Sequence, residues 1–334
     1  MHDNIFTREE IRILARCARV LMRCPDGDKQ EAKRFLQLAA EAGDRDSQLH
    51  WGLWLARMDA SGKRNNMLPG AAKYKEAIIW LNRAGEQGSV QAWYAISQIY
   101  LKSEFWRRSL EEAYRYMTMA AEAGDSMAQQ ALGSWIWRTR KDDPSKDVQA
   151  VYWLQKAEAQ GCVSAVPLLK KLASRAAPAT WALAAQRQLA NKAFKVPQVL
   201  IARVALAARF GLSIPEALLI DPARADRGHC MEIDIRDSYA RGRRRLILIQ
   251  TPEERQALDD TIRLLDGIDC STSGPEGNYR KRLYRFKRFV PDWDVLTADD
   301  AGGGLRVGLG DALLKHVQSA AVCTNGRQIR PGDW

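Results

Sequence analysis

The chain has 334 residues, which is long enough for about two domains of ordinary size. Its 51 Lys and Arg exceed its 40 Asp and Glu by a formal net charge of +11, and no uninterrupted apolar run approaches the roughly 20 residues that span a bilayer. Six scattered cysteines without a CxxC pair indicate reduced thiols, and four histidines without neighbouring ligands at metal-binding spacing argue against a zinc site.

The start of the chain places acidic residues before any apolar run, which is not the pattern of a secretory signal peptide. We therefore expect a cytoplasmic protein with no membrane partner, no cofactor and no bound metal. The first predicted helix runs from Thr7 to Arg23, because Thr7 is a suitable cap, Glu9 and Glu10 favour the positive end of the helix dipole, and apolar residues follow at helical spacing.

A fourteen-residue block occurs four times, at residues 31–44, 76–89, 112–125 and 149–162. The hexapeptide AAEAGD is identical in the first and third copies. Self-similarity at a period of roughly 35–45 residues is the signature of a helical repeat array. The sequence therefore predicts helix pairs that stack on one another to bury a continuous core.

Each copy of the block has the pattern of one amphipathic helix that ends at a glycine. An alanine, an adjacent bulky pair and a second alanine form an apolar stripe at helical periodicity; the bulky pairs are Phe35-Leu36, Trp80-Leu81, Tyr116-Met117 and Trp153-Leu154. The glycine suits a left-handed C-cap, and the Asp or Ser after the first three glycines can cap the next helix. In that next helix, two helices could touch backbone to backbone at the small residues Gly52, Ser97 and Gly133.

This pattern, with A-E-A-G-D closing the block and a small-x3-L-G core in the helix that follows it, resembles the Sel-one-like branch of the tetratricopeptide superfamily over residues 7–175. The resemblance implies an α-solenoid whose concave face binds proteins or peptides and which has no catalytic activity of its own. That family often has a Gly-x-Gly loop between the two helices of a pair. The corresponding loops of this chain, residues 57–75, 101–111 and 138–148, do not contain the motif.

The predicted domain organisation begins with a helical solenoid over residues 1–178, with about four helix pairs and a capping helix. Pro178 interrupts the repeat pattern, and a bridging helix is expected within residues 179–196. Residues 197–290 form a second domain, and residues 291–334 form a tail with one helix at 311–322. The expected fold class is mainly α, with an α-solenoid followed by a small α+β domain that contains one β-hairpin.

The second domain is expected to combine short helices with one pair of strands. Residues 229–236 and 245–250 are rich in β-formers, and a basic hairpin loop at 237–244 joins them. Thr251 and Glu254 form a capping box at the start of a helix. The other expected helices lie at residues 199–210, 214–220 and 279–290.

This order of elements resembles the start of a tyrosine-recombinase (phage integrase) catalytic domain over residues 197–290. The matching motifs are F-G-L, E-A-L and D-R-G at residues 210–212, 216–218 and 226–228, with the basic turn at 241–245. The chemistry of that family fails on this chain. Ser213 stands where the family has an Arg that binds the scissile phosphate, Ala240 and Arg241 stand where a Lys acts as general acid, and no Tyr follows residue 290. We therefore expect an inactive recombinase-like domain and no enzyme.

The segment YRKRLYRFKRF at residues 279–289 has six Lys and Arg and no acidic residue. Cations interleaved with aromatic rings are typical of nucleic-acid binding, and a hairpin loop beside this helix would favour that interpretation. The alternative is an amphipathic helix whose Leu283, Phe286 and Phe289 pack inward beneath a solvated charged face. The candidates for nucleic-acid contact are Arg241, Arg243, Arg244, Arg245, Arg280, Lys281, Arg282, Arg285, Lys287 and Arg288.

The tryptophans of the repeats are candidates for a peptide-binding groove, since Trp anchors many interfaces. Trp51, Trp80 and Trp153 lie in the apolar stripes and are expected in the core. The sequence thus predicts a non-enzymatic scaffold that binds another protein or peptide through its repeats; the alternative is a DNA-binding accessory protein of a bacterial mobile element with an inactive recombinase-like domain. The predicted partner-binding residues are the irregular tryptophans Trp54, Trp93, Trp135 and Trp137.

Overall fold

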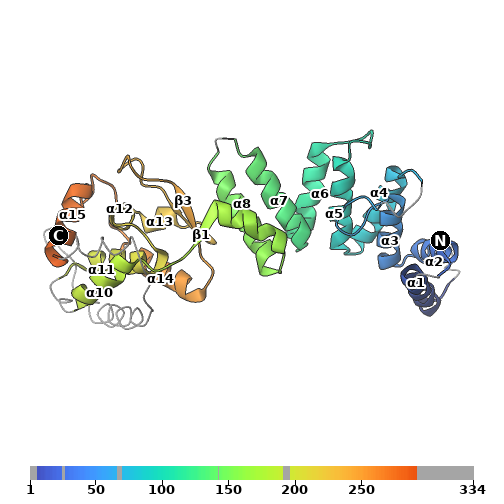
Figure 1. Ribbon diagram of the computed structural model, residues 1–334, viewed down its shortest axis with the longest axis horizontal. Helices are drawn as coiled ribbons and strands as arrows, with labels where there is room; N and C mark the ends of the chain where they lie inside the picture. Colours follow the sequence, from blue (N-terminus) through green and yellow to red (C-terminus); the bar gives the residue numbers. More distant parts are fainter. Residues whose placement is uncertain (1–5, 25–26, 66–69, 142, 191–195, 292–334) are drawn as a thin grey trace. The chain divides into compact units, whose positions relative to one another are not determined.

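The computed structural model describes residues 6–24, 27–65, 70–141, 143–190 and 196–291 (Figure 1). The chain divides into two compact units, residues 1–169 and residues 170–334. The helix expected at residues 311–322 lies outside the described residues.

The first unit is a stack of helix pairs, as the repeats predict. Each helix packs mainly on the next helix along the chain, and Figure 1 shows α5 to α8 side by side in chain order. This is the α-solenoid that the sequence indicates. Its elements are α1 (Arg8–Arg23), α2 (Lys29–Glu41), α3 (Arg45–Leu55), α4 (Tyr74–Glu86), α5 (Val90–Leu101), α6 (Leu110–Glu122), α7 (Ser126–Thr139) and α8 (Ser145–Ala159), followed by a 3-10 turn (Val163–Ala165) and α9 (Val166–Leu172).

The small residues of the block lie at the centre of this stack. The alanines at both stripe positions are fully buried in all four copies, and so is the second member of each bulky pair. The first member is less buried in three copies, because Phe35, Trp80 and Trp153 are half-buried and only Tyr116 is buried. Trp51, which lies in the helix after the first block, is buried. The expectation that all three tryptophans belong to the core therefore holds for Trp51 alone.

The glycine that closes each block adopts the left-handed conformation that was predicted. The φ values of Gly43, Gly88, Gly124 and Gly161 are 95°, 88°, 99° and 81°. The following aspartates cap the next helix, with Asp44 accepting from the Ser47 N–H at 2.7 Å and Asp125 accepting from the Ala128 N–H at 2.7 Å. Ser89 makes no side-chain cap, so that part of the prediction was wrong.

Two of the predicted backbone contacts are close enough to require glycine. A Cβ atom on Gly52 would lie 2.6 Å from Leu81 Cγ on α4, and one on Gly133 would lie 2.9 Å from Leu154 Cγ and 3.1 Å from the Ala150 carbonyl on α8. A buried glutamine beside each contact donates to a carbonyl of the preceding helix, from Gln48 to Ala40 and from Gln129 to Ala121, both at 3.1 Å.

The second unit combines six helices with a three-stranded sheet, counted over the described residues. The predicted hairpin is present, with β2 antiparallel to β3 and Cys230 opposite Leu248. A third strand, β1, adds to β3 in parallel, with Ala173 opposite Leu246. The elements are β1 (Ala173–Arg175), α10 (Thr180–Ala190), α11 (Gln198–Phe210), α12 (Ile214–Leu219), α13 (Pro222–Ala225), β2 (Cys230–Ile233), β3 (Arg245–Leu248), α14 (Pro252–Leu264) and α15 (Tyr279–Phe289).

The strand β1 was missed because it is three residues long and consists of Ala, Ser and Arg, which are weak β-formers. Its position at the sheet edge comes from tertiary pairing with β3. The core of this unit lies around α11, where Trp181 of α10 contacts Phe286 of α15 edge-on at 5.7 Å and donates its indole N–H to the Leu212 carbonyl at 2.9 Å.

The close contact at Gly133 predicts an unusual response to substitution. Replacing Gly by Ala in an open helix stabilises it by roughly 0.5–1 kcal/mol, but the added methyl group of Gly133→Ala would overlap Leu154. We expect Gly133→Ala to lower the free energy of unfolding by about 1–3 kcal/mol, measured by urea denaturation. The double variant Gly133→Ala with Leu154→Ala should lose less than the two single variants together, because the methyl group fills part of the new space. If the losses in the free energy of unfolding are additive, the contact between Gly133 and Leu154 does not limit the size of residue 133.

Candidate partner-binding site

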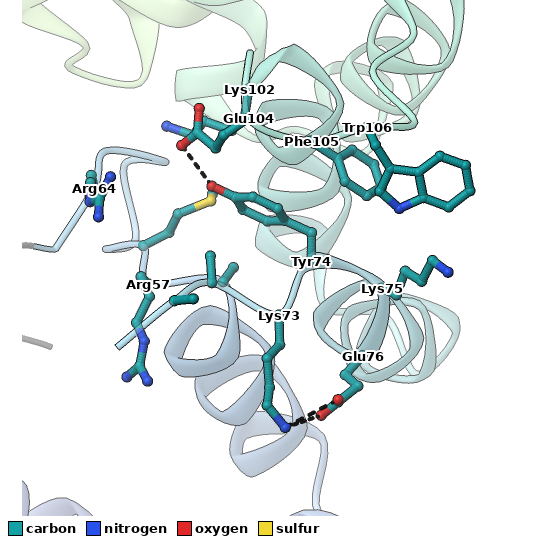
Figure 2. Close-up of a pocket in the computed structure, with 14 residues that line it drawn as sticks. Arg57, Arg64, Lys73, Tyr74, Lys75, Glu76, Lys102, Glu104, Phe105 and Trp106 are labelled. Atoms are coloured by element: carbon teal, nitrogen blue, oxygen red, sulfur yellow. Dashed lines mark hydrogen bonds and ion pairs between the residues drawn. The ribbon is translucent and has the colours of Figure 1, made fainter. Parts of the chain in front are cut away.

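A cavity of about 530 Å³ opens among the loops on one side of the first unit (Figure 2). It is formed by the loop after α3, the segment that leads into α4, and the loop after α5. A volume of this size is typical of sites that bind a small molecule or a few side chains. The described lining residues are Ala56, Arg57, Met58, Arg64, Ala71, Ala72, Lys73, Tyr74, Lys75, Glu76, Lys102, Glu104, Phe105 and Trp106.

The first part of the loop after α3, at residues 57–65, is held in a defined conformation. Asp59 accepts hydrogen bonds from the Ser61 hydroxyl at 2.7 Å and from the Lys63 N–H at 2.9 Å, which closes a tight turn. Lys102, at the end of α5, donates its ammonium group to the Gly62 carbonyl at 3.0 Å. The loops of two successive helix pairs are thereby tied together, and the cavity lies between them.

Aromatic and apolar side chains form the walls of the cavity. Met58 and Phe105 are buried, and Tyr74 meets Phe105 edge-on with a ring-centre separation of 5.4 Å. Trp106 differs from them, because 69% of its surface is exposed. The Lys75 ammonium lies 4.7 Å and the Arg107 guanidinium carbon 4.6 Å from the Trp106 ring centre, so two cations lie over this exposed ring.

The charged groups of the cavity are mainly positive. Both carboxylates are engaged, since Glu104 accepts from the Tyr74 hydroxyl at 2.9 Å and Glu76 pairs with Lys73 at 3.2 Å (Figure 2). The N–H of its own residue and the Tyr74 hydroxyl lower the pKa of Glu104, although burial opposes the shift. Burial and the neighbouring Glu104 carboxylate raise the pKa of Tyr74 to about 12, although Arg64 opposes the shift. At neutral pH the cavity therefore presents a neutral phenol beside a carboxylate.

Arg57 occupies a position that normally suits glycine. Its N–H donates to the Trp54 carbonyl at 3.1 Å and the Met58 N–H donates to the Leu53 carbonyl at 3.0 Å, which is the helix-ending pattern that Gly43 makes at the end of α2. The φ of Arg57 is 55°, a left-handed value that costs an L-residue about 1–2 kcal/mol. The Nε and Nη1 atoms of Arg57 are buried, and neither has a hydrogen-bond partner among the described residues. The guanidinium carbon lies 4.3 Å from the Trp54 ring centre.

Two of the helices at this cavity, α4 and α5, match a known repeat family. The model of the Sel1 repeat matches residues 25–44, 69–89, 90–125 and 126–162. Residues 25–162 contain four Sel1 repeats. The prediction of a Sel-one-like array is thereby confirmed, and the cavity lies among the loops of this Sel1 array.

Two solved structures are similar to the chain. A Sel1 repeat protein from Oxalobacter formigenes is 25% identical, over 47% of this chain and 62% of that one, with a TM-score of 0.39. A protective antigen of uropathogenic Escherichia coli strains, with an SLR fold, is 18% identical over 89% of this chain and 58% of that one, with a TM-score of 0.41. The chain thus spans about three fifths of the length of each. No curated protein matches the chain.

The four irregular tryptophans of the Sel1 array are half-buried, and none of them lines the cavity. Trp54 stacks on Trp51 at 5.0 Å, and Trp93 stacks on Tyr116 at 5.8 Å. Trp135 approaches Tyr114 at 6.3 Å, and the Arg140 guanidinium lies 4.8 Å from the Trp137 ring. The structure does not bring them together into one site. The sequence analysis did not single out the exposed Trp106. The sequence signal that could have done so is its position in a basic loop outside the repeated pattern.

Arg282, one of the predicted nucleic-acid contacts, is buried and cannot reach a nucleic acid, because it is only 3% exposed. Its guanidinium donates to the carbonyls of Gly277, Leu218, Cys270 and Ser271 at 2.7–2.8 Å. It lies beside Glu276, which also pairs with Arg203, a residue of α11 that is 1% exposed. Two buried arginines thus share one carboxylate, and backbone oxygens satisfy the rest of their donors. Burial lowers the pKa of Arg282, and this group acts within the core.

Three more predicted cations contact groups of their own unit. Arg245 pairs with Glu216 at 2.8 Å, Arg244 pairs with Glu232 at 2.7 Å, and Arg285 donates to the Pro275 carbonyl at 3.4 Å. Lys287 is half-buried. The remaining five are exposed and have no carboxylate within ion-pair distance among the described residues: Arg241, Arg243, Arg280, Lys281 and Arg288.

These five exposed cations come from two segments that meet in space. Tyr239 of the hairpin loop contacts Tyr279 at the start of α15, with ring centres 5.1 Å apart. The inner face of α15 packs on the core through Leu283, Phe286 and Phe289, as the amphipathic interpretation predicts. Tyr284 on the outer face is 71% exposed. The helix is therefore amphipathic and also lies beside the basic loop.

No metal centre is found in the described part of the chain. The His, Cys, Asp and Glu residues that the structure describes form no group able to hold a metal ion. Burial raises the pKa of Cys230 to about 12, so this thiol stays protonated beside His229 at neutral pH. Among the described residues, no helix is long and apolar enough to cross a membrane.

The Tyr74–Glu104 pair makes a prediction about pH. The neutral phenol is favoured in the folded state, so its stabilising effect is complete below the ordinary Tyr pKa of 10.0 and disappears as the pH rises through about 12. The chain has nine tyrosines, so the difference in near-ultraviolet phenolate absorbance between the wild type and Tyr74→Phe isolates one group. We expect that difference to titrate near 12, and at a lower pH in a Glu104→Gln background, where burial still holds the pKa of Tyr74 above its ordinary value. A transition near 10 in the wild-type background would contradict the pairing.

Proposed function

We propose that the protein is a non-enzymatic scaffold whose Sel1 array binds a partner protein at the loops around Trp106. The observation that carries this proposal is a 69% exposed tryptophan at the edge of a 530 Å³ cavity. Trp is enriched at the centres of protein interfaces, and a large exposed ring in a loop has no role in the core of its own chain. The residues that repeat are already engaged in helix packing, which leaves the loops for recognition.

A non-catalytic role is supported by the state of the reactive groups. The two carboxylates of the cavity are held by Tyr74 and Lys73, so neither is free to act as a base. Cys230 is buried and protonated. The resemblance to repeat proteins that hold other proteins gives the same expectation.

A cytoplasmic location is part of the proposal. Cys17 and Cys24 are exposed and free, and exposed free thiols suit a reducing compartment.

The scaffold proposal is tested with the full chain as bait in an extract of the source organism. We expect proteins that crosslink to the array to be recovered by the wild type and to fall about tenfold or more with Trp106→Ala, the usual scale of an interface anchor. The control is Leu110→Ala, an exposed apolar residue at the start of α6 and outside the cavity. Equal recovery by both variants would place the contact elsewhere, and recovery of no protein by the wild type would refute the scaffold.

A second candidate function is DNA binding by the second unit. The observation that favours it is the Tyr239–Tyr279 contact, which joins the cations of the hairpin loop to those of α15. Exposed cations neutralise phosphates, and the exposed Tyr284 offers a ring for stacking. The inactive recombinase-like domain predicted from the sequence would then serve as a docking module of a bacterial mobile-element protein.

The DNA candidate is tested by fluorescence anisotropy with a labelled duplex over a salt series. Binding through phosphates should weaken steeply with salt, and each lost phosphate contact should reduce the slope by about 0.9. We expect the pair Arg243→Ala with Arg280→Ala to weaken binding and flatten that slope. The pair Arg224→Ala with Arg263→Ala removes the same charge from exposed positions on α13 and α14 and should leave both unchanged. Absence of binding at low salt, or an equal loss of DNA affinity in the two double variants, would reject DNA binding by these cations.

A further inference from the structure

We infer that the cavity of the Sel1 array recognises an acidic segment of its partner, in which Asp or Glu side chains flank one apolar side chain. This inference rests on the proposed scaffold function and names the chemistry of the partner at the same site. It follows from the charge, the walls and one strained residue of the cavity.

The charge of the lining favours an anionic occupant. Five cationic side chains and two carboxylates line the cavity, a formal excess of three positive charges. Both carboxylates already have partners, whereas Arg64, Lys75 and Lys102 have no ion pair with a carboxylate among the described residues. Complementary charge steers a partner toward such a surface and excludes partners of the same sign.

The walls favour an apolar side chain between the charges. Met58, Phe105, Tyr74 and the exposed Trp106 line the cavity. A purely anionic small molecule would leave these apolar surfaces uncovered. A peptide segment can cover them with one aliphatic or aromatic side chain and still place its carboxylates on the surrounding cations.

Arg57 provides an independent argument. Four block-ending glycines make the same helix-ending turn without strain, but the turn after α3 has an arginine at a φ of 55°. A strained residue of this kind is a candidate for a functional role. Lys141 after α7 also has a positive φ, of 48°, but its side chain is exposed, whereas that of Arg57 is half-buried. Two of its nitrogen atoms are buried and have no partner among the described residues, although buried polar groups normally find one. A carboxylate of the partner would be a suitable acceptor.

The experiment selects a random peptide library displayed on phage against the purified full chain, and then measures the recovered peptides by fluorescence anisotropy. We expect acidic peptides with one apolar residue. Their affinity should fall about tenfold or more in the variant Arg64→Glu with Lys75→Glu, because both reversals oppose the ligand charge. It should also weaken between about 50 and 300 mM salt, as screening predicts.

The matched control is Lys63→Glu with Arg108→Glu. These two exposed cations lie in the loops after α3 and α5 and do not line the cavity. The control variant has the same net charge as the test variant. It should bind the peptides like the wild type. Arg57→Gly is a second test, since it keeps the turn and removes the guanidinium; we expect it to stay folded by circular dichroism and to bind severalfold more weakly.

Several results would overturn the inference. The selection could recover neutral or basic peptides, or no peptide at all. The test and control variants could lose equal amounts of peptide affinity. A labelled single-stranded oligonucleotide could compete for the same cations, which would make the cavity a general polyanion site. If the charge variants still recover the cellular partner through Trp106, the inference fails and the scaffold stands. If the wild-type chain recovers no cellular protein, the scaffold itself fails.

Discussion

Close contact between successive helices is the constraint on which the Sel1 array depends. The fully buried stripe alanines of each block, and Gly52 and Gly133 in the facing helices, let backbones approach so that one leucine of the neighbour fills the space that a Cβ would take. Dispersion forces favour such dense contacts, and they leave no volume for a larger side chain. Because these positions are fixed by packing, they say little about what the protein binds. Recognition must come from residues that the stack does not confine.

The second unit depends on a different interaction, the sharing of Glu276 by Arg203 and Arg282. Burying two guanidinium groups with one carboxylate is costly unless every donor is satisfied, and here backbone carbonyls from α12 and the loop before α15 complete the set. The cluster therefore joins α11, α12 and α15. It also explains why counting arginines overstates the positive surface of this unit: Arg282 belongs to the core, and Arg244 and Arg245 face carboxylates, although all three read as surface cations in the sequence.

Helices and their ends could be predicted because their signals are local. Thr251 and Glu254 form the expected capping box, and Gly43 has the expected left-handed turn, since each needs only near neighbours in the chain. The third strand could not be predicted, because Ala173–Arg175 pairs with residues more than 70 positions away. The cavity could not be predicted for the same reason. Its loops are tied together by the contact between Lys102 and the Gly62 carbonyl, which spans 40 residues and has no sequence pattern. Trp106 was visible in the sequence, but periodicity could not tell an exposed ring from a buried one.

Separation of stacking residues from loop residues lets a repeat array change its specificity without losing its fold. The described parts of the loops after α3 and α5 are anchored by the Asp59 turn and by Lys102, so Arg64 and Trp106 can be substituted with little effect on the helix contacts beneath them. The same holds for Lys75, which is exposed at the start of α4. Arg57 is the place where the two requirements meet. Its backbone must end α3 in a left-handed turn, which glycine would do without strain, while its side chain lies at the cavity over Trp54. The arginine at that position is a candidate for recognition, because its backbone is strained and two of its buried nitrogen atoms have no hydrogen-bond partner among the described residues.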